Sequence, residues 1–360
     1  MPANSSSKAY LIIIAIVFLI SGFLFIGLLH WNNTVTLRPL EGATRQHNSL
    51  SELFSIENTT ATRSSKYRPS KKTTSPPAES LSADSFYLDA SVVASQYSIN
   101  PAPCSTLPVK PYVVIIVFAR PNGYKLRQAI RSTWGSLVDT HCGVRMLFMF
   151  GRVYDSAVQE ALNEESKKYG DVIQSNQFDD RYRSAANKAV HLLQWGAAFC
   201  PESAYTAKID DDNWLNLQKY LNFLKAHPPS DIVYGGMFYA GTIVIRDPNS
   251  KYFVPREEFP QEYYPEYLSG ILYAFPTKHL AKVVYMAQHS QMTFNDDVFV
   301  CGVVATKAGL TRKEVPDYGW DHNIHDTTCP KRDKMCIHYS KIEDFYRLWN
   351  DPCFKYEKLC

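Results

Sequence analysis

The sequence contains no cysteine before residue 104 and no Cys-x-x-Cys pair. Zinc clusters are usually built from such closely spaced pairs, so their absence argues against one. The formal charge of +3 over 360 residues is close to zero, which argues against a general surface for nucleic acid. The sequence shows no repeat of about 20 to 50 residues, which excludes a solenoid or a propeller. These exclusions leave a globular protein, and its length is sufficient for one large domain and an additional segment.

The cysteines that are present indicate the compartment in which the chain folds. All eight lie in the part of the chain that starts at residue 104. An even number of cysteines beyond an apolar segment is typical of an oxidising lumen. Half of them crowd the C-terminal part, so we expect at least one disulfide to fix that segment. These four are Cys329, Cys336, Cys353 and Cys360.

Charge is also missing from residues 9–29, which form a continuous apolar run of 21 residues. As a helix this run would span roughly 31 Å, the thickness of a bilayer core. A cleaved signal peptide normally has a shorter apolar region and a small-x-small site, which does not follow Leu29. We therefore predict an uncleaved transmembrane signal anchor at 9–29, a cytoplasmic tail at 1–8, and a lumenal body.

Residues 30–108 are predicted to be a lumenal stem. Between residues 41 and 80, Ser, Thr and Pro supply 17 of 40 positions. Such a segment cannot bury enough apolar surface to fold, so we expect a disordered spacer. Glycosylation sequons occur at Asn32 and Asn58, and Asn58 is the better candidate because Asn32 lies close to the membrane.

The folded body is predicted to comprise residues 109–360. Residues 112–119 are an unbroken apolar run, typical of a buried parallel strand, and 144–150 repeats the pattern. Strand and helix patterns alternate along the body, which predicts an α/β class with a largely parallel sheet. Further strands are expected at 205–209, 231–237, 241–246 and 267–275, and helices at 185–200, 215–227, 277–288 and 298–308.

Three adjacent carboxylates, Asp210, Asp211 and Asp212, follow the strand predicted at 205–209. Like charges side by side repel, and a fold tolerates them most easily where water or a cation neutralises them. Carboxylate oxygens suit Mg²⁺ or Mn²⁺, and open α/β sheets collect ligands at strand ends. A solvated acidic turn, with an aspartate capping the next helix, explains the same residues. Taken alone, this run leaves both interpretations open.

Eight short motifs then occur in the order known from one enzyme family. They are Arg127-Gln128-Ala129-Ile130-Arg131-Ser132-Thr133-Trp134-Gly135; Phe148-Met149-Phe150-Gly151; Phe178, Asp180, Tyr182 and Lys188; Trp195 with Cys200-Pro201; Lys208 with Asp210-Asp211-Asp212; Tyr264-Pro265-Glu266-Tyr267-Leu268-Ser269-Gly270; Asp296-Asp297-Val298-Phe299-Val300-Cys301-Gly302; and His338 with Trp349. From about residue 111 to 350 the chain resembles the β-1,3-galactosyltransferases and N-acetylglucosaminyltransferases of glycosyltransferase family 31. It departs from the family at Ser184-Ala185-Ala186, where Asn-Leu-Thr is usual, at Leu268 in place of Cys, and at Asp296 in place of Glu.

The resemblance implies a GT-A nucleotide-diphospho-sugar transferase fold, a Rossmann-like α/β/α sandwich. It implies a Mn²⁺-dependent type II Golgi membrane enzyme that forms a β-1,3 bond with inversion, on a glycolipid or glycoprotein acceptor. We expect UDP-galactose as the donor, with a UDP-linked N-acetylhexosamine as the alternative. A membrane-anchored chaperone or lectin on this fold is a hypothesis of another class, but it would be expected to lose one of the acidic sites. A metal-dependent phosphodiesterase usually needs more His and Asp ligands than this sequence offers.

The donor side is expected to use the acidic run and the motifs around it. The resemblance implies Asp212 as the metal ligand and His338 as a second ligand, with Asp210 or Asp211 turned to the ribose or supporting the ligands without touching the metal. Lys208 is also predicted to be a cofactor-binding residue. Arg127 and Arg131 are predicted to donate to the diphosphate, although a solvated helix face explains them equally.

The acceptor side is expected to use the pair Asp296 and Asp297. The acceptor hydroxyl must lose a proton as it attacks, and a carboxylate within hydrogen-bond reach can take it. The resemblance implies Asp297 as this catalytic base and Asp296 as its neighbour. Alternatively, the pair caps the helix predicted at 298–308, whose N-terminus would lower the pKa of an aspartate.

Overall fold

The computed structural model describes residues 86–138, 142–320, 329, 333–338 and 340–354. The predicted cytoplasmic tail, the signal anchor at 9–29 and the sequons at Asn32 and Asn58 lie outside these residues. Within the described part of the chain, no helix is both long enough and apolar enough to cross a membrane.

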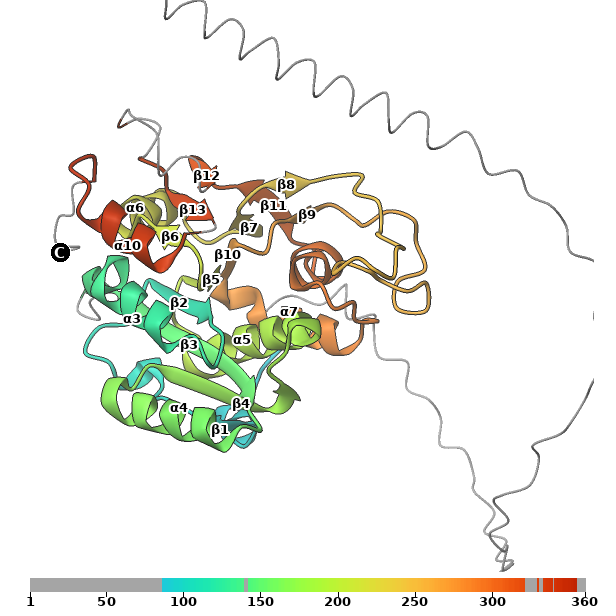
Figure 1. Ribbon diagram of the computed structural model, residues 1–360. Coiled ribbons are helices and arrows are strands. Elements are labelled where there is room, and N and C mark those ends of the chain that lie inside the picture. The colour runs from blue at the N-terminus through green and yellow to red at the C-terminus, as the bar shows by residue number, and fades with distance from the viewer. Residues whose placement is uncertain (1–85, 139–141, 321–328, 330–332, 339, 355–360) are drawn as a thin grey trace, which may run out of the picture. The chain divides into compact units, whose positions relative to one another are not determined.

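A mixed sheet forms the centre of the described body and runs in the order β1-β4-β3-β2-β5-β10-β7-β11 (Figure 1). The central strand β2 pairs in parallel with β5, from Val113 opposite Tyr205 to Phe118 opposite Asp210. The two strands therefore end side by side, at the edge where open α/β sheets collect ligands. The strands of the sheet are β1 (Tyr97–Ile99), β2 (Val113–Phe118), β3 (Val144–Arg152), β4 (Val172–Asp179), β5 (Tyr205–Asp210), β7 (Ile232–Gly235), β10 (Leu272–Pro276) and β11 (Thr311–Glu314).

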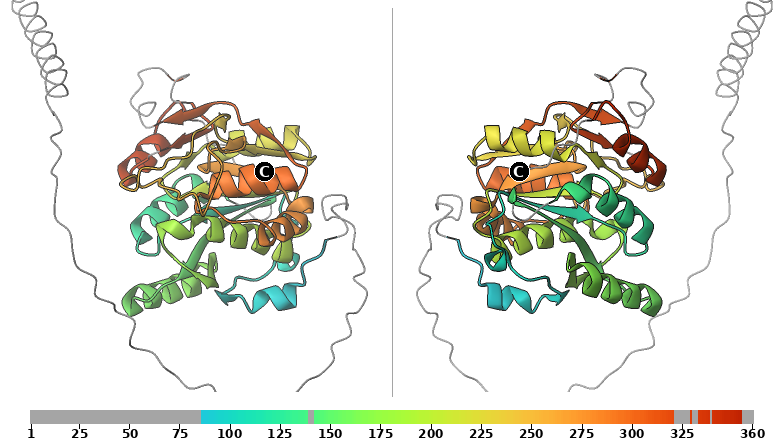
Figure 2. Two further views of the ribbon diagram at one scale, coloured as in Figure 1. Left: turned by 90° about the vertical axis from the view of Figure 1, so that its right-hand side faces the viewer. Right: turned by 90° about the vertical axis from the view of Figure 1, so that its left-hand side faces the viewer.

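Helices cover both faces of this sheet, as the two views of Figure 2 show. A strand is pleated, so successive residues of β2 point to opposite faces. Val114 and Ile116 join the core beneath α5 and α7, whereas Val113 and Ile115 join the core beneath α3, α6 and α10. The expected three-layer α/β/α arrangement is confirmed. The helices are α2 (Ala90–Ala94), α3 (Tyr124–Ser132), α4 (Ser156–Tyr169), α5 (Ala185–Phe199), α6 (Leu217–Ala226), α7 (Leu280–Gln288), α8 (Ala305–Lys307) and α10 (Ile342–Trp349), with 3₁₀ turns at Cys104–Thr106, Trp134–Leu137, Tyr182–Ser184 and Thr277–His279, and a π-helix at Asp297–Val304.

The sheet is less parallel than the sequence pattern predicts. Strand β10 runs antiparallel to both β5 and β7, and β1 runs antiparallel to β4. A parallel connection usually needs a crossover helix, but the described chain between β7 and β10 contains only short strands and loops. The start of β10, rather than its end, therefore lies beside the end of β5.

Short strands replace two of the longer elements that the sequence predicts. Residues 267–275 divide into β9 (Tyr267–Leu268) and β10, and β9 pairs with β8 (Phe238–Tyr239). The strand expected at 241–246 is wrong, because only Ile243 forms an isolated bridge there. Arg246 organises this stretch instead, and its guanidinium donates to the carbonyls of Val254, Phe259 and Gln261.

A small second sheet follows the acidic run. It has the order β12-β13-β6, from Tyr318–Trp320, Cys336–His338 and Trp214–Leu215. The helix predicted at 215–227 therefore begins later, at Leu217, and its N-cap is Asn216. The side-chain oxygen of Asn216 accepts a hydrogen bond from the backbone N–H of Lys219 at 3.1 Å. None of the three aspartates caps this helix, so that interpretation of the run is wrong.

The folded body begins before residue 109, inside the segment predicted to be stem. Helix α2 and strand β1 both precede that residue, and β1 forms one edge of the main sheet. A disulfide joins Cys104 to Cys200, at the end of α5. The boundary at 108 is therefore wrong, because a three-residue strand among prolines leaves almost no periodic pattern. The expected disulfide in the C-terminal segment is confirmed between Cys329 and Cys353.

Candidate functional site

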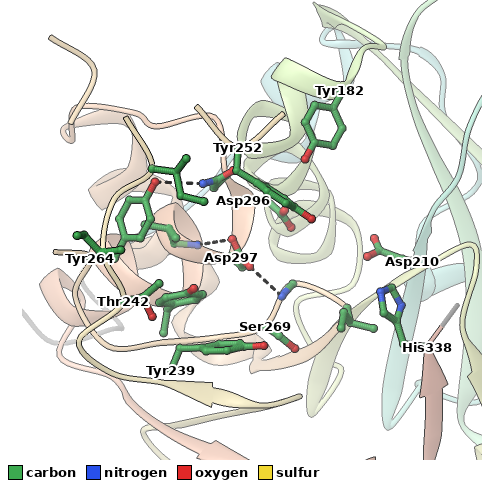
Figure 3. Close-up of a pocket in the computed structure, with 17 residues that line it drawn as sticks. Tyr182, Asp210, Tyr239, Thr242, Tyr252, Tyr264, Ser269, Asp296, Asp297 and His338 are labelled. Carbon is green, nitrogen blue, oxygen red and sulfur yellow. Dashed lines mark hydrogen bonds between the residues drawn. The ribbon is translucent and has the colours of Figure 1, made fainter. Parts of the chain in front are cut away.

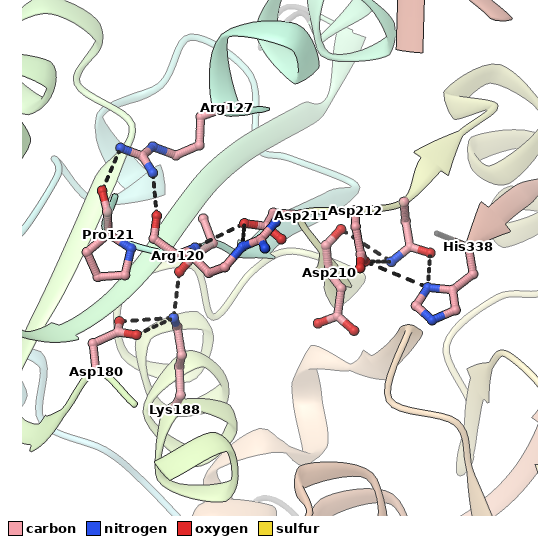
Figure 4. A network of polar contacts seen from close by, with 11 residues as sticks. Arg120, Pro121, Arg127, Asp180, Lys188, Asp210, Asp211, Asp212 and His338 are labelled. Atoms are coloured by element: carbon pink, nitrogen blue, oxygen red, sulfur yellow. Dashed lines mark hydrogen bonds and ion pairs between the residues drawn. The ribbon is translucent and has the colours of Figure 1, made fainter. Parts of the chain in front are cut away.

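The acidic run lies at the shared end of β2 and β5, and its three carboxylates point to different places (Figure 4). Asp211 turns back toward β2, where one of its oxygens accepts from the backbone N–H of Arg120 at 3.0 Å and from its guanidinium at 3.2 Å. Its side chain is 8% exposed. Asp211 therefore holds the loop after β2, which agrees with the supporting role predicted as the alternative, and it lines neither of the two cavities described below.

Asp212 lies next to His338, which the small sheet brings in from β13. Their closest atoms, Oδ1 and Nδ1, are 3.7 Å apart. The same Nδ1 lies 3.1 Å from the side-chain oxygen of Asn213, and this contact orients the ring. Burial and the neighbouring Asp211 raise the pKa of Asp212. The structure thus brings together the two residues that the sequence predicts as metal ligands, although they are more than 120 residues apart.

A carboxylate beside an imidazole in this acidic surrounding fits a divalent cation. The described residues contain no group of three or more His, Cys, Asp and Glu side chains arranged to hold a metal. The protein would therefore supply two ligands, Asp212 and His338. The oxygens of a diphosphate and of water would complete the coordination of such an ion.

Asp210 faces the other way and lines a cavity of about 500 Å³ together with Asp296 and Asp297 (Figure 3). Burial and the carboxylates of Asp296 and Asp212 raise the pKa of Asp210 to about 7, although Lys208 opposes the shift. The nearest oxygen of Asp210 is 2.6 Å from the ammonium of Lys208.

Lys208 is almost completely buried and lines neither this cavity nor the second one described below. Its ammonium contacts Asp210, lies 3.3 Å from Asp296, and donates to the carbonyl of Gly270. The prediction that Lys208 binds the cofactor is therefore wrong. Its partners are two carboxylates and one backbone carbonyl of the protein.

Asp297 begins the π-helix and points into the cavity of about 500 Å³. Its carboxylate accepts from the backbone N–H of Val298 at 2.8 Å and from that of Gly270 at 3.3 Å. Burial, followed by the charge of Asp296, raises the pKa of Asp297 to about 6. The expected lowering by a helix N-terminus is wrong, and so is the capping interpretation, because Asp296 makes no side-chain cap bond.

Tyrosines form much of the rest of this cavity. The rings of Tyr239 and Tyr267 are stacked, with centroids 5.1 Å apart and planes inclined by 21°. Tyr182, Tyr252 and Tyr264 line the same space, and in the view of Figure 3 Asp210 and His338 lie across from Tyr264. The cavity therefore offers aromatic faces and hydroxyl groups beside three carboxylates.

A second cavity, of about 1010 Å³, lies on the other side of the acidic run. Asp212 lines it, and so do three basic residues, Arg120, Lys125 and Lys341. The sequence analysis missed all three. A signal was present, because Arg120 directly follows the apolar strand that ends beside the aspartates.

Arg127 and Arg131 are not available to a ligand. The guanidinium of Arg127 is buried and makes two contacts with Glu165, at 2.9 Å and 2.6 Å. It also donates to the carbonyl of Arg120 at 2.6 Å. Arg131 contacts Glu165 at 2.7 Å and Asp171 at 2.8 Å. Neither arginine lines either cavity, so the prediction that they bind the diphosphate is wrong.

Known proteins resemble this chain over the region that contains the site. Human β-1,3-galactosyltransferase 1 is 28% identical over 257 residues, which cover 69% of this chain and 76% of that protein. The human acetylgalactosaminyl-O-glycosyl-glycoprotein β-1,3-N-acetylglucosaminyltransferase is 35% identical over 209 residues, which cover 55% of this chain and 53% of that protein.

Similarity to solved structures is weaker. A mannosyltransferase from Pyrobaculum calidifontis, solved with GDP-mannose and Mn²⁺, matches with a TM-score of 0.36 and 12% identity, over 69% of this chain and 62% of that chain.

The family model described as Galactosyltransferase matches residues 125–316, more than half of the chain. The matched region includes the acidic run at Asp210 and the pair Asp296 and Asp297. The chain therefore belongs to the galactosyltransferase family.

Proposed function

We propose that this protein transfers a hexose from a UDP-sugar to the 3-hydroxyl of a glycan acceptor, with inversion to a β-1,3 bond. Both relatives described above are named as β-1,3-glycosyltransferases. UDP-galactose is the proposed donor, a UDP-linked N-acetylhexosamine is the alternative, and the fold is of the GT-A type. A type II anchor at 9–29 would place the enzyme in the Golgi membrane, with the described body in the lumen.

One observation supports this function above the others: the acidic run stands between two cavities of different chemistry. Asp212 lines the cavity that is rich in basic residues, and Asp210 lines the cavity that holds Asp297. A transferase needs this arrangement, because the donor and the acceptor must occupy adjoining sites when the sugar moves between them.

The basic cavity suits the nucleotide diphosphate. Arg120 has a side chain that is 64% exposed, and Lys125 and Lys341 line the same space. These cations can contact phosphate oxygens, which Arg127 cannot reach. A divalent ion held by Asp212 and His338 would offset the charge that develops on the departing UDP.

The tyrosine-lined cavity suits the acceptor. Aromatic faces can pack against the apolar side of a sugar ring, and tyrosine hydroxyls can bond its hydroxyl groups. Asp297 would take the proton of the attacking hydroxyl. Its pKa of about 6 leaves it ionised at neutral pH, yet more basic than an ordinary carboxylate.

A donor screen tests the proposal. The full chain in detergent would be supplied with Mn²⁺, a panel of glycan acceptors, and UDP-galactose or a UDP-linked N-acetylhexosamine. We expect release of UDP and formation of a β-1,3-linked product with one of these donors. Asp212→Ala should lower kcat/KM for the donor by about 10³-fold, with the fold unchanged by circular dichroism. A wild-type chain that consumes none of the UDP-sugars would contradict the function, and a fully active Asp212→Ala variant would contradict the metal site.

A further inference from the structure

Lys208 is one of the most deeply buried charged groups of the described chain, and it lies between the two halves of the site. Its side chain is 2% exposed. It arises from β5, whose end carries the acidic run, but its ammonium reaches the segment that precedes β10 and the start of the π-helix. Burying a lysine is unfavourable unless the charge is paired and hydrogen-bonded. The partners of this ammonium therefore indicate what the residue does.

The partners of Lys208 belong to three separate segments. The ammonium lies 2.6 Å from Asp210 on β5 and 3.3 Å from Asp296 before the π-helix. It also donates to the carbonyl of Gly270, just before β10. One side chain therefore links the donor-side strand to two of the backbone segments that line the acceptor side.

The backbone of Gly270 carries this link on to Asp297, through the two peptide groups on either side of its Cα atom. The carbonyl of Gly270 accepts from Lys208, while its N–H donates to Asp297 at 3.3 Å. The approach is close, because a Cβ atom added at Gly270 would lie 3.2 Å from the Cβ of Asp297. A displacement of this backbone segment would therefore displace the carboxylate that faces the acceptor cavity.

We infer that Lys208 is a positioning residue of the proposed transfer reaction, which holds the backbone at Gly270, and through it the carboxylate of Asp297, in place against the end of β5. This inference depends on the proposed function. Lys208 has no direct contact with donor or acceptor in this role. It acts by keeping Asp297, the proton acceptor, at a fixed distance from the proposed metal ligands Asp212 and His338.

A purely structural ion pair is the competing explanation, and the chain offers a matched control for it. Lys188 is also nearly buried, with a side chain that is 10% exposed. It donates to a backbone carbonyl, that of Ala119, at 2.7 Å and pairs with Asp180 at 3.0 Å. Neither partner lines a cavity. Loss of Lys188 therefore removes a comparable buried charge without touching the acceptor side.

The experiment compares Lys208→Met with Lys188→Met in the full chain. For each variant we would measure the thermal unfolding temperature, the Kd of UDP with Mn²⁺, and kcat for transfer at saturating donor and acceptor. We expect both variants to unfold at a lower temperature.

Lys208→Met should keep the Kd of UDP within about threefold and lose about 10²-fold in kcat, since the base is displaced. Lys188→Met should keep kcat within about threefold. Equal losses of kcat in the two variants, or a normal kcat in Lys208→Met, would overturn the inference.

A charge-balanced variant covers the case in which Lys208→Met does not fold. The double variant Lys208→Met/Asp296→Asn removes one buried charge of each sign and is compared with Asp296→Asn alone. A kcat at least about tenfold below that of the single variant, at equal affinity for UDP, is expected if Lys208 holds the backbone at Gly270. A double variant that matches the single variant would overturn the inference. A wild-type chain that is inactive with every donor would instead overturn the proposed function.

Discussion

The raised pKa of Asp297 suits this residue to accept a proton, but it makes the folded protein less stable at neutral pH. Burial and the neighbouring Asp296 raise its pKa to about 6, so the folded protein holds this proton more tightly than the unfolded chain does. A group of this kind contributes stability below the pKa of the unfolded chain, and that contribution is lost as the pH rises through about 6. At neutral pH the ionised Asp297 therefore lowers the free energy of unfolding.

We predict that Asp297→Asn separates these two effects. Transfer should fall by about 10² to 10⁴-fold because the proton acceptor is lost, while the affinity for UDP is kept. The free energy of unfolding of the variant, relative to wild type, should increase between about pH 4 and about pH 7, from the ordinary pKa of an aspartate to just above the raised one, by on the order of 1 kcal/mol because solvent partly screens the site. Calorimetry at several pH values would measure this. A relative stability that falls with rising pH would contradict the raised pKa.

The sequence allows some site residues to be predicted and not others. Asp212 and His338 could be paired because their residue types and motifs point to the same chemistry, and the structure brings them together. Arg127 was misassigned because its partner, Glu165, belongs to a helix pattern that gives no sign of an inward-facing charge. Arg120 was missed because an isolated arginine after a strand looks like an ordinary turn residue.

Helix α3 shows how one element can support a site without entering it. Arg127 joins α3 to α4 through Glu165, and both side chains are 1% exposed. It also fixes the loop after β2 by donating to the carbonyl of Arg120. Removal of one partner leaves an uncompensated buried charge, which strongly destabilises a protein.

We predict opposite phenotypes for two neighbouring arginines. Arg127→Met should lower the free energy of unfolding by about 3 kcal/mol, with a donor KM within about threefold of wild type where the protein is folded. Arg120→Ala should change stability by less than about 1 kcal/mol and raise the donor KM by about tenfold, because its exposed guanidinium faces the basic cavity. Thermal unfolding and donor titrations would measure both. A donor KM raised more by Arg127→Met than by Arg120→Ala would restore the arginine assignment made from the sequence.

Two features of the elements could not be predicted from sequence patterns: the π-helical form of residues 297–304 and the direction of strand β10. Residues 298–308 have a helical pattern, but periodicity cannot reveal the wider turn of a π-helix, which often occurs at functional sites. Arg312, on β11, stabilises it by donating to the carbonyls of Cys301 and Gly302. The direction of β10 could not be predicted either, because a buried apolar run looks the same in a parallel and in an antiparallel strand.

The described body as a whole includes a segment that composition assigned to the stem. Strand β1 covers the edge of β4, and the disulfide between Cys104 and Cys200 closes a loop of 96 residues in sequence. A disulfide that closes a long loop typically stabilises a fold by about 2 to 5 kcal/mol. The N-terminal boundary of the folded body can therefore be tested by measuring thermal stability.

We predict that a chain starting at residue 86 is more stable than one starting at 109. The shorter chain exposes the edge of β4 and leaves Cys200 without its partner, so it should unfold at a temperature at least several degrees lower and aggregate more readily. Thermal unfolding of both secreted chains would measure this. Cys104→Ser in the longer chain is the control that removes only the disulfide. Equal unfolding temperatures for the two chains would contradict the revised boundary.

The reversed direction of β10 has a further consequence for how such a protein can diversify. The segment that enters this strand faces the tyrosine-lined cavity, while the segments that leave β2 and β5 face the basic one. Replacement of the loop that joins β8 to β9 would therefore allow the same fold to bind a new acceptor, while the residues that line the basic cavity remain unchanged. Because, of these two cavities, the loop between β8 and β9 lines only the tyrosine-lined one, selection can change the acceptor without changing the residues of the basic cavity.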